Sequence, residues 1–325
     1  MRPVRWILIW LSLWGYVAAK EVEPNYTDLG QWARTRELDV RPNYTTHSLL
    51  LTNEWMRLEF KLDTARLDLD GYEVRLSFPV RKQGGQWQIA TRDMDTVLGP
   101  LTKPPKRGPG RPIKIIALGA GHGGMDPGNL AGPKREKTYT LAVARAIRPL
   151  LEKAGLKVVM IRDDDVRVDL EERAEKANLA RADLFVSVHF NGYPGANPGA
   201  VSGVETYCLT PSGCSSSNDS EKHGGLWARG NKTDRENINL AFQIHRAVVD
   251  QLDLPDRGVS RARFKELTLL DMPGVLIEGG YLTNDHDVSL IDSAGGRNRY
   301  ARAIADGILT YKRLVERGQA EDGSN

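Results

Sequence analysis

The residues after position 112 alternate short apolar runs with amphipathic stretches, and this alternation constrains the fold more than any other feature. Five apolar runs have the length and continuity of buried strands: 113–118, 156–161, 184–188, 204–209 and 274–277. Four further stretches carry apolar residues at helical spacing: 138–154, 170–181, 236–252 and 297–313. Strands that alternate with helices predict an α/β fold, in which a largely parallel, twisted sheet has helices on both faces.

The pattern before position 100 is different. Short runs of alternating polarity are separated by the turn dipeptides Asp70-Gly71 and Gly84-Gly85, which predicts a small all-β domain. A segment rich in proline and basic residues, "PLTKPPKRGPGRP", follows, and it can form neither a helix nor a core. We therefore expect an N-terminal arm at 20–47, a β domain at 48–99, a linker at 100–111, the α/β domain at 112–314 and a disordered tail at 315–325.

The first residues resemble a targeting segment. Arg2 and Arg5 precede an apolar run, and the small residues Val17-Ala18-Ala19 follow it. This pattern is typical of a secretory signal peptide at 1–19, which predicts a periplasmic or secreted protein with no stable membrane span after cleavage. The alternative is an uncleaved membrane anchor, although the run is short for a spanning helix of about 20 residues.

Charge and cysteine content narrow the chemistry. A net charge of +3 lacks the strongly basic character of a nucleic-acid-binding protein, so we expect no nucleic-acid partner. Cys208 and Cys214 could form a small loop-closing disulfide in an oxidising compartment, or they could be a free, partly buried pair. Two cysteines cannot make a thiolate zinc site alone, so a metal site would need histidine and carboxylate ligands.

Four histidine and glutamate residues are predicted to meet at one edge of the sheet. His122, His189 and Glu278 each follow or end a predicted strand, and Glu136 lies at the N-terminus of the helix predicted at 138–154. Two imidazoles and one carboxylate form a recurrent catalytic zinc shell, and a second carboxylate can serve as general base. A lone histidine at a strand end is more often structural, but the convergence of four such residues favours a metal site.

Several motifs occur in an order and spacing that resemble a known family. These are "GAGHGGMDPGNLAGPKREK", "VDLEERAEKANLARADLFVSVHFN", "SGVETY", "DRGVSRARF" and "MPGVLIEGGYLTN". Together they resemble the zinc-dependent N-acetylmuramoyl-L-alanine amidases of the cell wall, amidase type 3, over residues 112–314. The resemblance implies that His122, Glu136 and His189 bind Zn²⁺ and that Glu278 is the catalytic carboxylate. It also implies hydrolysis of the amide between N-acetylmuramic acid and L-alanine in peptidoglycan.

The resemblance also marks framework residues and departures. Arg173, Asn178, Asp183 and Asn191 match framework positions, with structural roles expected. Gly119 stands where the family usually has an aspartate that could orient a metal ligand, and Thr268 stands where relatives often have an arginine.

Two other segments have open roles. The β domain loosely resembles the N-terminal domain of copper amine oxidases, and it could bind a wall component or an activator protein. The segment 211–234 could be a lid, a substrate rim or an inhibitory segment.

Two other functions fit the same residues. A zinc peptidase acting on peptidoglycan stem peptides would use a similar metal shell, and a non-catalytic wall-binding protein would follow if Gly119 disabled the site. Other polar residues are predicted to lie at the surface or in packing positions: His223, His245, His286 and the run Asp163-Asp164-Asp165.

Overall fold

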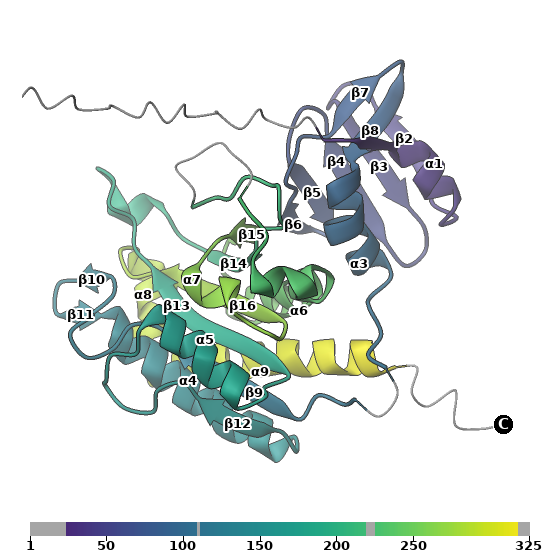
Figure 1. Cartoon of the computed structure of the whole chain (residues 1–325). Coiled ribbons are helices and arrows are strands. Elements are labelled where there is room, and N and C mark those ends of the chain that lie inside the picture. The colour runs from purple at the N-terminus through teal and green to yellow at the C-terminus, as the bar shows by residue number, and fades with distance from the viewer. Residues whose placement is uncertain (1–23, 109–110, 219–224, 318–325) are drawn as a thin grey trace, which may run out of the picture.

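The computed structural model describes residues 24–108, 111–218 and 225–317 (Figure 1). The predicted signal peptide and His223 lie outside these residues. Within the described ranges, none of the helices combines the length and the apolar character that a membrane crossing requires.

Six strands form the sheet of the α/β region. In spatial order they are β12 (Lys157–Met160), β9 (Ile115–Ala120), β13 (Leu184–Asn191), β16 (Gly274–Tyr281), β14 (Val204–Leu209) and β15 (Asp256–Ala262). The first four are parallel, whereas β14 is antiparallel to β16 and parallel to β15. The predicted α/β fold with a largely parallel sheet is therefore confirmed. Strand β15 was not predicted, because charged residues and Gly258 interrupt its apolar pattern.

Helices cover both faces of this sheet (Figure 1). They are α4 (Glu136–Lys153), α5 (Leu170–Leu179), α6 (Asp234–Leu252), α7 (Lys265–Thr268), α8 (Asp285–Asp292) and α9 (Ala294–Glu316). Apolar side chains of α4, α6 and α9 share one core cluster with Val186, while α5 and α7 share a second cluster with Phe185. Because successive residues of a strand point to opposite faces, these two clusters identify which side chains of the sheet face which helices.

The smaller elements of the α/β region lie in its connections. The strands β10 (Leu130–Ala131) and β11 (Lys134–Arg135) form a short hairpin, and two 3-10 turns occur, η2 (Pro198–Ala200) and η3 (Arg229–Thr233).

The residues before the linker form a compact β-module, defined here as residues 24–102. It contains β1 (Tyr26–Asp28), α1 (Leu29–Arg34), β2 (Asp39–Asn43), β3 (Ser48–Thr52), β4 (Arg57–Lys61), β5 (Arg66–Leu69), β6 (Tyr72–Arg75), β7 (Arg81–Gln83) and β8 (Gln86–Ala90). A helical run ends it: α2 (Thr91–Asp93), η1 (Met94–Leu98) and α3 (Gly99–Thr102). Strands β2 to β6 form an antiparallel meander, and β1, β8 and β7 form a separate small sheet.

Three predicted segment boundaries are wrong. The expected arm before residue 48 contains regular structure, because Leu29 and Ala33 of α1 are fully buried and β2 pairs with β3. The linker begins after α3 rather than at Pro100, which is buried. The tail does not begin at 315, because α9 continues to Glu316 and buries Val315.

The β-module is joined to the α/β region as part of one sheet. Val74 of β6 pairs with Val259 of β15, so the meander extends the larger sheet to eleven strands. The backbone N–H of Glu73 also donates to Asp256 Oδ2 at 2.8 Å. We call this contact of β6 with β15 the module junction.

A buried histidine lies beside the module junction. His245 of α6 faces Thr206 Oγ1 with Nδ1 at 3.1 Å and Asp256 Oδ1 with Nε2 at 2.8 Å. Asp256 also accepts from the backbone N–H groups of Glu73 and Gly258. Thr206, His245 and Asp256 are called the junction cluster below. Its histidine has a packing role, in agreement with one of the two predicted environments.

The two cysteines do not form the disulfide that their spacing allowed. Both are free and buried, and they lie in different surroundings. Cys208 packs in the main core, where burial raises the pKa of its thiol to about 11. Cys214 lies beside Ser77 of the β-module, and burial raises the pKa of its thiol as well. Buried thiols of this kind are weak nucleophiles.

Candidate metal centre

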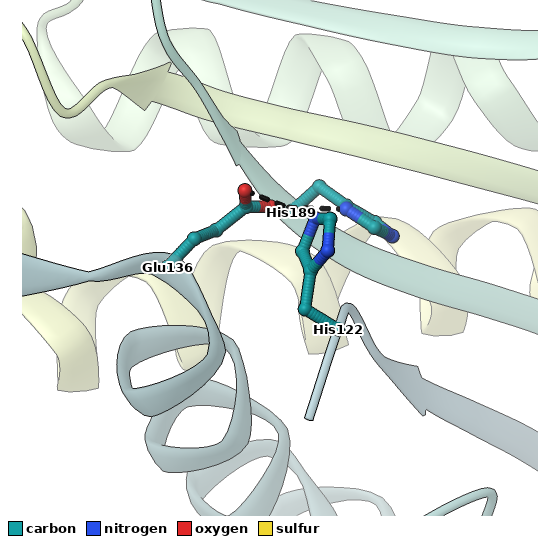
Figure 2. A group of neighbouring side chains, drawn as sticks. All are labelled: His122, Glu136 and His189. Carbon is teal, nitrogen blue, oxygen red and sulfur yellow. Dashed lines mark hydrogen bonds and ion pairs between the residues drawn. The ribbon is translucent and has the colours of Figure 1, made fainter. Parts of the chain in front are cut away.

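His122, Glu136 and His189 converge at the carboxyl edge of the sheet (Figure 2). One potential ligand atom from each lies within 4.8 Å of the others. His122 Nε2 lies 3.0 Å from Glu136 Oε2, and His189 Nδ1 lies 3.0 Å from Glu136 Oε1. His122 follows β9, His189 belongs to β13 and Glu136 is the first residue of α4. We call these three residues the metal cluster.

The loop that carries His122 has an unusual backbone. His122 has a φ of 58°, and Gly123 and Gly124 also have positive φ. Arg173 Nη2 donates to the carbonyl of His122 at 2.8 Å, and the N–H of Gly124 donates to Asp165 Oδ1 at 2.8 Å. A left-handed histidine is uncommon and persists only where its surroundings hold it, so these contacts fix the direction of the imidazole.

Two glycines lie so close to the side chains of the metal cluster that a larger residue would collide with them. A Cβ added to Gly121 would lie 2.3 Å from His189 Cε1, and one added to Gly128 would lie 2.5 Å from Glu136 Oε2. The φ of Gly121 is not positive, so glycine is not required there for a left-handed backbone. It is required because the His189 ring lies directly against its α-carbon.

Glu136 is an ionised, fully hydrogen-bonded carboxylate. Burial raises its pKa, but hydrogen bonds and charges from His122 and His189 outweigh burial and hold the pKa well below its usual range. The backbone N–H groups of Asn129 and Phe190 also donate to it, at 2.9 and 3.1 Å. A carboxylate held in this way is negatively charged throughout the physiological range.

His122 has a second carboxylate behind it. Its Nδ1 lies 2.8 Å from Asp126 Oδ2, on the side of the ring away from Glu136. Burial lowers the pKa of His122, but the contacts with Glu136 and Asp126 raise it by more. A proton on Nδ1 leaves the Nε2 lone pair directed to the metal cluster.

Glu278 lies beside the metal cluster on the neighbouring strand. It is the register partner of His189 across β13 and β16, and the alternation of β16 puts both side chains on the α5 and α7 face. Glu278 Oε2 is buried and has no hydrogen-bond partner among the described residues. Burial raises its pKa well above the usual range, and the charges of Glu136, Glu205 and Glu266 add to the effect.

Several residues that support the site were not recognised as such from the sequence. Asp126 and Asn129 lie within the "GHGGMDPGN" motif, so their position was a usable signal. Asp165 lies in an exposed turn, in agreement with its predicted surface position, and it also accepts hydrogen bonds from Gly124 N and from Lys137 Nζ. Arg162 Nη2 donates to the carbonyl of Gly121 at 2.8 Å. A strand-to-helix turn therefore supports the histidine loop.

The predicted framework residues have structural contacts. Asn178 donates to the carbonyl of Leu269 and accepts from Asp271 N, Asp183 accepts from Ile115 N, and Asn191 Oδ1 accepts from Gly192 N.

The segment 211–234 leaves the sheet away from the metal cluster. Because β14 is antiparallel to β16, the chain after Leu209 emerges at the opposite edge of the sheet from His189. The described parts of the segment contact two arginines. Arg263 Nη2 donates to the carbonyl of Pro211, and Ser217 Oγ donates to the carbonyl of Arg261. They therefore do not form a lid over the metal cluster.

Comparisons with known proteins agree with the motifs. The family model for N-acetylmuramoyl-L-alanine amidase matches residues 116–310, which leaves the β-module outside the match. The chain is 35% identical over 201 residues to the uncharacterized protein YqiI of Bacillus subtilis, covering 61% of this chain and 84% of that protein. It is 31% identical over 233 residues to the amidase AmiC of Neisseria meningitidis, covering 65% of this chain but only 55% of AmiC.

Solved amidase structures share the fold of the α/β region. The catalytic domain of CwlV from Bacillus (Paenibacillus) polymyxa aligns with a TM-score of 0.52 and 29% identity, covering 62% of this chain and 99% of that one. AmiC2 of Nostoc punctiforme aligns with a TM-score of 0.52 and 30% identity, covering 63% and 98%.

Proposed function

Because the chain belongs to the N-acetylmuramoyl-L-alanine amidase family, we propose that it is a zinc-dependent enzyme that cleaves the amide between N-acetylmuramic acid and L-alanine in peptidoglycan. The observation that carries this proposal is the placement of Glu278 beside the metal cluster, since it joins a candidate proton acceptor to a candidate metal site. The sequence pattern of residues 1–19 supports action in the cell envelope.

The metal cluster fits zinc. Two imidazole nitrogens and one carboxylate oxygen form a common catalytic zinc shell. Gly121 and Gly128 keep side chains away from the space where these atoms converge. A zinc ion held there supplies Lewis-acid polarisation of the substrate carbonyl and activation of a water molecule.

The chain's own residues divide the remaining work. Glu136 supplies the negative charge of the site, and its hydrogen bonds keep it ionised. Glu278 takes the proton of the attacking water and delivers one to the departing amine of L-alanine. The raised pKa of Glu278 suits the second half of this role, because the carboxyl group retains the proton until the amine accepts it. To accept the first proton Glu278 must be ionised, which the positive charge of a bound zinc ion would favour.

The test is digestion of purified sacculi by the purified protein. A chelator is expected to abolish release of intact stem peptides, and added zinc is expected to restore it. Mass analysis separates the other functions. Shortened peptides still attached to sugar would support a stem-peptide peptidase, and binding to sacculi without any release by the zinc-loaded protein would support a non-catalytic wall-binding protein.

A further inference from the structure

A buried carboxylate outside the metal cluster lies behind one of its histidines. Glu266 belongs to the short helix α7 and has an exposed fraction of only 2%. Its Oε1 lies 3.9 Å from His189 Nε2, and its Oε2 lies 4.0 Å from Arg173 Nε. Neither oxygen has a hydrogen-bond partner among the described residues, and neither does His189 Nε2. Two unpartnered polar groups therefore face each other in the interior.

Arg173 does not account for this carboxylate fully. Its Nε, Nη1 and Nη2 already donate to the backbone carbonyls of Val168, Ala120 and His122, at 3.1, 2.8 and 2.8 Å. The guanidinium therefore balances the charge of Glu266 without satisfying its hydrogen-bonding capacity. Because a buried carboxylate without a hydrogen bond is costly, a further donor is expected.

His189 has its free donor position on that side. Its Nδ1 faces Glu136, so Nε2 lies on the part of the ring directed away from the metal cluster. The other histidine has the same arrangement with its nitrogens exchanged, since His122 directs Nε2 to Glu136 and Nδ1 to Asp126. Each histidine of the metal cluster therefore has its own carboxylate behind it, one near the surface and one buried.

We propose that Glu266 is a positioning residue that accepts a hydrogen bond from Nε2–H of His189 and so directs the Nδ1 lone pair toward the metal. This proposal rests on the proposed function, because it presupposes that the metal cluster binds zinc. The present separation exceeds the length of a hydrogen bond, and a side-chain movement of about 1 Å closes it. Carboxylates behind ligating histidines fix the tautomer and strengthen metal binding.

The first experiment measures zinc affinity of the full chain by competition with a chromophoric chelator. Glu266→Gln is expected to weaken zinc binding by about 10- to 100-fold. Glu266→Asp, which retains the charge at a shorter reach, is expected to give an intermediate affinity. The matched control is Glu171→Gln, which removes the exposed ion pair with the neighbouring Lys265 and leaves His189 untouched. Its affinity is expected to equal that of the unmodified chain.

A folded Glu266→Gln variant with unchanged zinc affinity would overturn the proposal, and Glu266 would then be only a counter-ion for Arg173. That outcome leaves the proposed function intact, whereas an unmodified chain that binds no zinc at neutral pH contradicts the proposed function itself.

The second experiment needs no variant. The ring ¹H and ¹⁵N signals of the zinc-loaded, unmodified chain report the Nε2–H group of His189, and the sequence has only six histidines to assign. A downfield-shifted Nε2–H signal that exchanges slowly with solvent supports the proposal. An Nε2–H group that exchanges freely with solvent, or a His189 that binds zinc through Nε2, would overturn it.

Discussion

Within the described residues, the junction cluster and the metal cluster both combine histidine and carboxylate groups, and they differ in how completely these groups are hydrogen-bonded. In the junction cluster, His245 has a partner for each ring nitrogen, and Asp256 accepts from three donors. In the metal cluster and its surroundings, His189 Nε2 and Glu278 Oε2 have no partner among the described residues. Both clusters lie on the same sheet, six strands of which form the α/β region.

The difference shows how a structural histidine is told apart from a functional one. Burial differs between them, because the His245 side chain is fully buried whereas those of His122 and His189 are 25% and 13% exposed. The remaining hydrogen-bonding capacity is the more informative difference, because a structural cluster satisfies its own polar groups whereas a binding site keeps some for a ligand. Substitutions in the two clusters should therefore affect different measurable quantities.

The largest expected effect is on catalysis. Glu278→Gln should lower the rate of stem-peptide release from sacculi by at least about 100-fold, because the amide cannot accept the proton of the attacking water. The rate is measured by mass analysis of the released peptides over time.

The same variant should retain its zinc and its free energy of unfolding, since the substitution removes no hydrogen-bonded partner and no proposed ligand. Release of stem peptides at the unmodified rate would contradict the proposed role of Glu278. Loss of zinc would indicate that Glu278 is itself a zinc ligand.

The next effect is on stability. His245→Ala should lower the free energy of unfolding by about 3 kcal/mol, because it leaves the carboxylate of Asp256 and the hydroxyl of Thr206 without their shared partner. Denaturant titration of the metal-free chain measures the loss. The rate of peptide release per folded molecule should not change, and a selective loss of rate would erase the distinction between the two clusters.

The smallest effect is on the pH dependence of stability. Burial raises the pKa of Asp256, but the hydrogen bond from His245 and the backbone N–H groups outweigh it, so the pKa is below that of the unfolded chain. Asp256 therefore contributes stability above its unfolded pKa of about 4, and this contribution is lost as the pH falls through the folded value.

The measurement is the difference in free energy of unfolding between the unmodified chain and Asp256→Asn. That difference should be about 1 to 3 kcal/mol at neutral pH, because the substitution removes the negative charge that strengthens the hydrogen bonds of Asp256. It should become smaller below about pH 4, where Asp256 of the unmodified chain is itself protonated. A constant difference across this range would show that the charge of Asp256 does not stabilise the module junction.

Much of the α/β region could be predicted because its residues carry local signals. The apolar runs of β9, β13, β14 and β16 and the periodicity of the long helices placed the sheet and its faces. His122, Glu136 and His189 followed from the rule that sites lie at the carboxyl ends of parallel strands, together with the motifs around them.

Other features had no local signal. Glu266 lies 77 positions after His189 on a helix of four residues, so nothing near it in the sequence indicates that it approaches a histidine. Strand β15 has a charged, glycine-containing sequence that becomes a strand because neighbouring strands satisfy its backbone. The α1 helix was missed because its six residues are too few to show a period. Tertiary contacts decide such segments.

The pairing of β6 with β15 has a consequence for the order of assembly. Glu73 and Asp256, which meet at the module junction, are separated by 183 residues in the chain. During synthesis from the N-terminus, the β-module is complete long before the strand that covers its edge exists. Until β15 is made, the backbone N–H and C=O groups along the outer edge of β6 have no strand to pair with, and such an edge can pair with a strand of another chain. Contacts between residues so far apart in the sequence slow folding, so the uncovered edge of β6 is a site where the incompletely folded chain can pair with other chains.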